Sequence, residues 1–319
     1  MIVQFGRYDF SCVFKDDALL PVYKGSTFRG VLGHALKKVV CALRRQTCRD
    51  CLLRQSCVYA VVFEGVHDDG PAPEKRRLAA PPNAYVIEPP LEKKVEYKAG
   101  ESLDFSLLLF GRATDFLPYF IYAVEQIGKS GIGKRLNGKA GGFELKAVSY
   151  GKTVLYSAEA RKVEHIQAAR RDISLADSTE DEGDVVRKLK ISLLTPLRLK
   201  YQSRLEPQLP FHVLIRAALR RVSSLMAYHG DGEPELDYKD LVRRAMRVAT
   251  SESSIRWYDW KRYSNRQEQE MFLGGMVGDI TYAEVPSEYL PILRFCEEVH
   301  LGKQTAFGLG KFRIDTAAG

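Results

Sequence analysis

Alternating and helical hydrophobic patterns divide the first part of the chain into short elements. Residues 2–14 alternate between the two faces of a strand and are rich in Val, Phe and Tyr, which predicts a strand. From Ser26 to Arg45 apolar residues recur at helical spacing, with Ser26 or Thr27 as the expected N-cap. The apolar stripe of this predicted helix is formed by Phe28, Leu32, Ala35, Leu36, Val39 and Leu43.

Further patterns complete the first half. Residues 84–90 and 102–111 predict strands, residues 116–128 predict a helix, and residues 143–151 predict another strand. The order is β-α-β-β-α-β, which is typical of a ferredoxin-like domain. The acidic, polar segment at 176–184 then suits a solvated linker more than a packed element.

The same order recurs in the second half. Its predicted elements are a strand at 189–201, a helix at 210–228, an inserted helix at 238–250, a strand at 254–264, a hairpin or two short strands at 271–285, a helix at 287–299 with Ser287 as N-cap, and a strand at 307–315. We therefore expect an α+β protein of two tandem ferredoxin-like (βαββαβ, RRM-like) domains, with a cysteine-rich insertion at 41–57 in the first. The expected boundaries are 1–166 for the first domain, 167–186 for an acidic linker, and 187–319 for the second domain.

Within the composition, the net charge is the feature that indicates a class of partner. The 319 residues include 48 Lys and Arg against 40 Asp and Glu, a formal net charge of +8 that favours a polyanionic partner. No apolar run reaches the roughly 20 residues needed to span a bilayer. The N-terminus also lacks the basic-then-apolar layout of a signal peptide. We therefore expect a cytoplasmic protein that does not contact membranes.

Four of the six cysteines crowd into one segment, with the spacing C-x6-C-x2-C-x5-C. They are Cys41, Cys48, Cys51 and Cys57. In a reducing compartment this crowding indicates metal or redox chemistry more than a disulfide framework. A structural zinc site is the first hypothesis, an iron–sulfur cluster has similar ligand needs, and four incidental thiols are the third reading.

A glycine-rich loop, HLGKQTAFGLGKF at 300–312, precedes the last predicted strand. Its residues Gly302, Gly308 and Gly310 allow the backbone to approach a phosphate chain and offer N–H groups, while Lys303 and Lys311 add charge. The alternative is a tight helix-to-strand connection in which glycine only supplies positive φ angles.

These motifs together resemble one family. The glycine loop before the terminal strand of a second ferredoxin-like domain resembles the signature of RAMP proteins. The segments GSTFRGVLGHALKK, CVYAVVFE, GKSGIGKRLNGKAGGFEL, WYDWKRYSNRQ and GGMVGDITY resemble, in the same order, the CRISPR-associated endoribonucleases that process precursor crRNA, the sixth Cas family. One departure is His300, which stands where the family loop often begins with glycine and offers a side-chain donor instead. We expect it to contact RNA or to cap the end of the preceding helix.

The resemblance implies a metal-independent reaction. The 2′-hydroxyl upstream of the scissile phosphate attacks it, which leaves a 2′,3′-cyclic phosphate and a 5′-hydroxyl. Such a reaction needs a base, an acid and cations beside the developing charge. Family members commonly place a histidine near the first helix, helped by a tyrosine or a lysine.

His34 fits that role, because on a helical wheel it lies opposite the apolar stripe and near Lys38. We take His34 as the candidate catalytic residue and Tyr23 and Lys38 as candidate helpers. A solvated surface histidine without function is the alternative. Basic and aromatic residues interleave along 254–267, so we add Arg256, Arg262 and Arg266 to the candidate RNA contacts, together with the glycine loop and His300.

The expected partner is CRISPR repeat RNA, with no cofactor for catalysis. The rival hypothesis is a non-catalytic RAMP subunit that binds guide RNA inside a CRISPR effector complex. A weaker third reading is a zinc-containing RNA-binding adaptor outside CRISPR biology. The sequence leaves open whether the protein is a monomer or a dimer.

Overall fold

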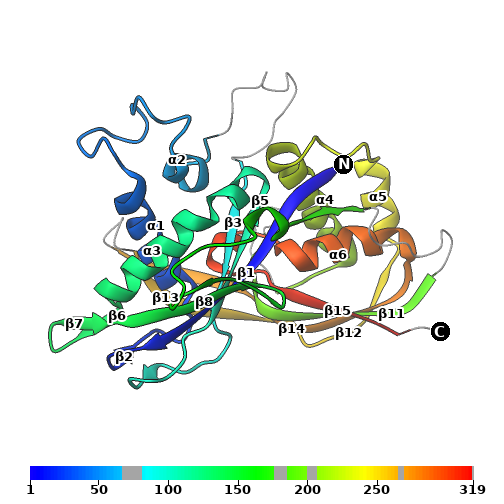
Figure 1. Ribbon diagram of the computed structural model, residues 1–319. Coiled ribbons are helices and arrows are strands. Elements are labelled where there is room, and N and C mark those ends of the chain that lie inside the picture. The colour runs from blue at the N-terminus through cyan, green and yellow to red at the C-terminus, as the bar shows by residue number, and fades with distance from the viewer. Residues whose placement is uncertain (67–80, 176–184, 200–206, 265–268, 318–319) are drawn as a thin grey trace. The chain divides into compact units, whose positions relative to one another are not determined.

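The computed structural model describes residues 1–66, 81–175, 185–199, 207–264 and 269–317 (Figure 1). They divide into two compact units. The N-terminal unit comprises Val3–Asp172 and Tyr228–Gly230, and the C-terminal unit comprises Met1–Ile2, Ile173–Ala227 and Asp231–Gly319. Each unit carries its own antiparallel sheet, and both are ferredoxin-like, which confirms the predicted fold class.

The sheet of the N-terminal unit has the strand order β3-β5-β1-β8-β9, and β10 also pairs with β1. Its strands are β1 (Ile2–Phe14), β3 (Tyr85–Glu88), β5 (Phe105–Phe110), β8 (Phe143–Tyr150), β9 (Thr153–Ser157) and β10 (Arg171–Ser174). Two helices, α1 (Gly25–Val40) and α3 (Leu117–Ser130), pack against each other (Figure 1). Strand β5 is buried along its whole length, and its Phe105 packs against Phe28 of α1 with ring centroids 4.7 Å apart. Strand β10 falls inside the segment expected to be a linker.

The apolar stripe predicted for the first helix accounts for its packing, but its ends differ from the prediction. Phe28, Leu32 and Leu36 are buried. The N-cap is Lys24, without a side-chain capping bond, so the Ser26 or Thr27 cap was wrong. The helix ends at Val40, one residue before the first cysteine of the four-cysteine segment.

A second, smaller sheet of this unit has the order β4-β2-β6-β7. Its strands are β2 (Ala18–Leu19), β4 (Glu96–Tyr97), β6 (Ile132–Leu136) and β7 (Lys139–Gly141). Asn137 and Gly138 join β6 to β7, and both have positive φ, 50° and 83°. Asn-Gly favours such two-residue hairpin turns, so the segment GKSGIGKRLNGKAGGFEL forms a hairpin.

The C-terminal unit has a five-stranded sheet of order β12-β14-β11-β15, with β13 also paired to β14. Its strands are β11 (Val185–Leu197), β12 (Ala249–Ser253), β13 (Arg256–Ser264), β14 (Gln269–Pro286) and β15 (Phe312–Ala317). Its helices are α4 (Phe211–His229), α5 (Tyr238–Ala245) and α6 (Leu290–Val299). Phe211 packs edge-on against Tyr282 and Tyr289, with ring centroids 4.9 and 5.2 Å away, which joins α4 to the sheet and to α6.

Two predicted features of this unit were wrong. The segment 271–285 belongs to one 18-residue strand, β14, not to a hairpin or two short strands. Its glycines serve close packing instead of a turn, because a Cβ at Gly274 would lie 2.6 Å from the indole nitrogen of Trp257. The helix α6 has Tyr289 as its N-cap, and Ser287 begins a short 3-10 turn before it.

Candidate functional site

His34 lies on the exposed face of α1, one helical turn before Lys38, which is also exposed. Among the residues that the structure describes, the His34 side chain forms no hydrogen bond or ion pair. The imidazole is therefore available to a ligand from solvent. It also contributes nothing to the buried stripe of its helix.

Tyr23 precedes α1 and is half-buried. Burial raises the pKa of its phenol far above the ordinary value, and the Glu88 carboxylate raises it further. The phenol therefore keeps its proton at neutral pH. If it takes part in chemistry, it acts as a hydrogen-bond donor or an acid and not as a base.

The start of α1 is held by a buried lysine that the sequence patterns did not single out. Lys24 is fully buried, and its ammonium group donates to the carbonyl oxygen of Glu92 at 2.9 Å. The same ammonium group lies 5.7 Å from the ring centroid of Tyr97, whose hydroxyl donates to the Glu92 carboxylate at 2.7 Å. Burial lowers the pKa of Lys24, while Glu92 opposes that shift. This contact set fixes the end of the helix that carries His34.

The glycine loop has a backbone that requires glycine. Gly302, Gly308 and Gly310 have φ angles of 91°, 82° and 74°. A Cβ at Gly310 would lie only 1.7 Å from the carbonyl oxygen of Leu301. These glycines therefore supply the positive φ angles of a tight connection, as the second reading of the loop proposed.

Several amides of this loop are already used inside the protein. The N–H of Lys303 donates to the Arg198 carbonyl at 2.9 Å, and that of Gly310 donates to the Pro196 carbonyl at 3.1 Å. The N–H of Gly308 donates to the Thr305 carbonyl at 2.7 Å, and that of Lys311 donates to the Thr195 hydroxyl at 2.8 Å. These amides, including those of Gly308 and Gly310, are therefore not offered to a phosphate. What the loop presents outward is charge, since Lys303 is exposed and Lys311 is partly exposed.

His300 does not contact solvent, so its predicted role as an RNA-contacting donor was wrong. It is 0% exposed and is the C-cap of α6, with φ 61°. Its Nδ1 lies 3.1 Å from the carbonyl oxygen of Leu309, within the glycine loop. Arg221 on α4 is buried beside it and donates to the carbonyl oxygens of Val299 and His300. The sequence patterns did not single out Arg221.

The β13–β14 pair presents part of the predicted basic and aromatic strand. Arg256 and Tyr258 are exposed, and the Trp257 indole donates to the Asp259 carboxylate at 2.8 Å. Arg262 pairs with Met271 in the strand register, while its side chain and all of Arg266 lie outside the described residues.

Arg198 links this strand pair to the glycine loop. Its guanidinium donates to the Gly274 carbonyl at 2.8 Å, and its own carbonyl accepts from Lys303. Nothing in the spacing of the sequence distinguishes Arg198 from its basic neighbours, since both partners are distant in the chain.

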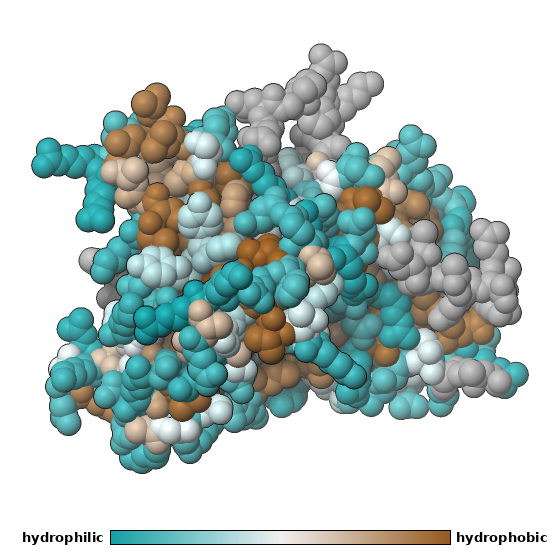
Figure 2. Space-filling view, viewed as in Figure 1, coloured by the Kyte–Doolittle hydropathy of each residue, from teal (hydrophilic) through white to brown (hydrophobic). Residues whose placement is uncertain are grey.

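The four cysteines lie on the connection between α1 and α2 (Val58–Phe63), and all are free and partly exposed. Their side chains line one small cavity of about 20 Å³ together with Lys37 and Tyr59. Lys37 hydrogen-bonds Cys48, which raises the pKa of the lysine. The connection also exposes Leu52 (86% exposed), and Figure 2 shows hydrophobic side chains gathered there.

This cavity has the donor chemistry of a metal site without its closed geometry. Among the described residues, no group of three or more His, Cys, Asp or Glu side chains is arranged to hold a metal ion. By type, four thiols are the donors of a structural zinc site, and all four line this one cavity. None of the helices that the structure describes is long and apolar enough to cross a membrane.

The chain combines two ferredoxin-like units with a glycine loop before the final strand, the features on which the resemblance to RAMP proteins rests. Residues 191–312 match the family model described as CRISPR-associated endoribonuclease Cas6. Residues 3–168 match a second family model, AF_1859_N, described as an N-terminal domain. The chain therefore carries a Cas6 endoribonuclease domain in its C-terminal unit, which supports the resemblance to CRISPR-associated RAMP-type endoribonucleases.

Relatives extend over nearly the whole chain. An uncharacterized protein of Archaeoglobus fulgidus is 28% identical over 300 residues, which covers 92% of each chain. Among solved structures, a Cas6 of Thermus thermophilus determined as a product complex is similar with a TM-score of 0.56 and 12% identity, over 98% of this chain and 100% of that one. At such identity the likeness establishes the fold.

A chain of a partial Cas6-RT-Cas1–Cas2 complex is similar with a TM-score of 0.57 and 13% identity. The match covers 99% of this chain and 46% of that chain. This protein therefore spans about half the length of that relative.

Proposed function

We propose that this protein cuts CRISPR repeat transcripts into guide RNAs without a metal ion. The match of residues 191–312 to the Cas6 endoribonuclease model supports an RNA-cleaving enzyme. The main support for the proposed chemistry is the position of His34. Its imidazole is exposed on α1 and forms no hydrogen bond or ion pair within the described part of the chain.

The reaction requires two proton transfers. His34 takes the proton of the 2′-hydroxyl as that oxygen forms a bond to the adjacent phosphorus, and the bond from phosphorus to the 5′-oxygen breaks. The leaving 5′-oxygen takes a proton from a donor, and the candidate is the phenol of Tyr23, whose raised pKa keeps it protonated at neutral pH. Lys38 supplies positive charge one turn from His34, where it would stabilise the phosphorane. The products are a 2′,3′-cyclic phosphate and a 5′-hydroxyl.

The experiment is cleavage of the cognate repeat RNA in EDTA, followed by analysis of the ends. Cleavage should persist and leave a cyclic phosphate, because the RNA itself supplies the nucleophile. A substrate with a 2′-deoxy sugar upstream of the cut should bind and stay whole. Strict Mg²⁺ dependence, or cutting of the deoxy substrate, contradicts the mechanism.

A second candidate function is the non-catalytic one. A relative of known structure belongs to a Cas6-RT-Cas1–Cas2 complex, which supports association of this protein with a larger CRISPR assembly. Tight binding of repeat RNA by the wild-type protein, with no cleavage under any condition tested, favours this reading.

We also propose that Cys41, Cys48, Cys51 and Cys57 hold a structural metal ion, with zinc as the first choice. The connection between α1 and α2 contains no helix or strand, and an ordered loop of that length usually has a function or a stabilising cross-link. A metal bound by four thiolates leaves no position for water, so it supports folding and not chemistry.

A further inference from the structure

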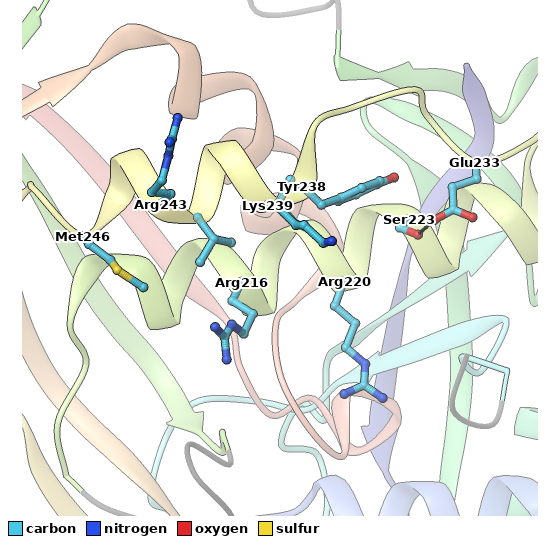
Figure 3. Close-up of a pocket in the computed structure, with 10 residues that line it drawn as sticks. Arg216, Arg220, Ser223, Glu233, Tyr238, Lys239, Arg243 and Met246 are labelled. Carbon is cyan, nitrogen blue, oxygen red and sulfur yellow. Dashed lines mark hydrogen bonds between the residues drawn. The ribbon is translucent and has the colours of Figure 1, made fainter. Parts of the chain in front are cut away.

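The helices α4 and α5 of the C-terminal unit enclose a groove with its own chemistry. The cavity has a volume of about 450 Å³, within the range of ligand pockets. Ten residues line it: Arg216, Leu219, Arg220, Ser223, Glu233, Tyr238, Lys239, Val242, Arg243 and Met246. We call it the α4–α5 groove (Figure 3).

Four basic side chains line this groove. Arg216 and Arg220 lie one turn apart on α4, and Lys239 and Arg243 lie one turn apart on α5. Figure 3 shows Arg216 and Arg220 extending from α4 in the same direction, Lys239 reaching from α5 toward α4, and Arg243 pointing away from α4. Like charges at this spacing destabilise a helix unless an anion lies between them.

Little within the protein balances these charges. The one carboxylate that lines the groove, Glu233, accepts a hydrogen bond from the Ser223 hydroxyl at one end. Arg243 is paired with Asp240. Arg216, Arg220 and Lys239 form no ion pair with a carboxylate within the residues that the structure describes.

The floor of the groove is apolar and held in place. Leu219 and Val242 line the groove together with the cations, and Met246, 59% exposed, lies at the end opposite to Ser223 and Glu233 (Figure 3). The ring of Tyr238 is fixed, because its hydroxyl donates to the Pro234 carbonyl at 2.8 Å. Helix α5 is itself anchored, because the Tyr289 hydroxyl donates to its Leu241 carbonyl at 2.8 Å. The groove therefore exists without a ligand.

An apolar slot rimmed by guanidinium groups has the chemistry of a nucleotide site. Guanidinium groups bind phosphates in a bidentate geometry, and a tyrosine ring and a methionine offer adaptable surfaces to a base. We propose that the α4–α5 groove binds a single-stranded nucleotide of the repeat RNA, with its base in the slot and flanking phosphates on Arg216 and Arg220. This inference rests on the proposed function, because that function makes repeat RNA the ligand.

The test uses the full-length protein and repeat RNA with a 2′-deoxy sugar at the cut, so that binding is measured without cleavage. Arg216→Glu combined with Arg220→Glu should weaken binding at least tenfold. The slope of log affinity against log salt should fall by about 1.4, because two single-strand phosphate contacts are lost. Repeat RNAs carrying 4-thiouridine at successive positions should crosslink, at one position, to the peptide that contains Tyr238 and Met246.

The matched control is Arg247→Glu, compared with Arg220→Glu alone. Arg247 is also exposed and follows α5, but it does not line the groove. Its reversal should change affinity less than twofold. Met246→Glu places a carboxylate in the groove without removing a cation, so it should weaken binding in the same way as Arg220→Glu.

Equal effects of Arg220→Glu and Arg247→Glu, with no crosslink to this peptide, overturn the groove proposal. Unchanged RNA affinity in the double variant Arg216→Glu, Arg220→Glu also overturns it. The proposed function is judged separately, by whether the wild-type protein cuts an unmodified repeat. A wild-type protein that binds RNA through the groove but cuts nothing would refute the function and leave the groove site standing.

Discussion

The guanidinium of Arg221 on α4 donates to the backbone carbonyl of His300 at the end of α6, with an Nε–O distance of 3.1 Å. A second bond, from Nη2 to the Val299 carbonyl, measures 2.8 Å. Two carbonyl groups left open by the end of α6 are thereby satisfied by a buried cation. Burial lowers the pKa of Arg221 to about 10.

Replacing this arginine should cost stability and not RNA affinity. Arg221→Met keeps much of the side-chain volume but removes both bonds, so the free energy of unfolding should fall by about 2–4 kcal/mol. Denaturant unfolding measures it. The control is Arg220→Met, the exposed neighbour, which should change stability by less than about 0.5 kcal/mol. Equal effects of the two variants would mean that the buried bonds contribute little.

His34→Ala separates the enzyme from its non-catalytic rival. It removes a proton-transfer group worth about 10²–10⁴-fold in rate and takes nothing from the buried face of α1. Single-turnover cleavage should collapse while RNA affinity and Tm stay nearly constant. His165→Ala, an exposed histidine elsewhere in the same unit, is the control. A joint fall of activity and stability would show His34 to be a packing residue.

The four-cysteine segment should carry about one metal ion per chain. Because structural metal binding is coupled to folding, Cys48→Ser or Cys51→Ser should lower Tm and metal content before it affects cleavage. Elemental analysis of the purified protein measures the metal. Cys296→Ala, a buried thiol on α6, should leave the metal content unchanged. If the wild-type protein contains neither zinc nor iron, the four cysteines are incidental thiols.

Stability should decline in alkaline solution because buried groups keep their protons only in the folded state. Burial raises the pKa of Tyr85 to about 12, with Arg29 opposing the shift, and raises that of the Cys296 thiol to about 12. Unfolded chains release these protons at about pH 10 and about pH 8.5.

The free energy of unfolding should therefore be constant below about pH 8.5 and fall above it, by about 1.4 kcal/mol per pH unit for each group. Urea titrations between pH 8 and 11 measure this slope. Tyr85→Phe removes one of the titrating groups, so its slope above about pH 10 should be shallower than that of the wild type. Identical slopes would show that Tyr85 titrates normally.

The cations of the glycine loop should act through phosphate contacts. Lys303→Ala combined with Lys311→Ala should weaken RNA binding and reduce the salt dependence of affinity, since fewer counterions are released. Filter binding over a range of salt concentrations measures both. Lys152→Ala, an exposed lysine in the turn between β8 and β9, is the control. An unchanged salt slope in the double variant would mean that the loop is only a turn.

Local patterns in the sequence were enough to predict the fold. The alternation over β1, the apolar stripe of α1 and the βαββαβ order in each half come from side-chain periodicity, which depends on neighbours in the chain. The exposed position of His34 followed from the same stripe, because a helix that buries Phe28, Leu32 and Leu36 must turn the opposite face to solvent.

Tertiary contacts decided the features that the patterns missed. Residues 274–278 looked like a turn, but their glycines lie in β14, where Trp257 and Pro196 leave no room for a Cβ. The sequence placed His300 among the RNA contacts and did not single out Arg221, but the end of α6 needs partners for its carbonyls and buries both. Hydrogen-bond partners that lie 79 residues apart leave no periodic trace in the sequence, so only the folded chain reveals them.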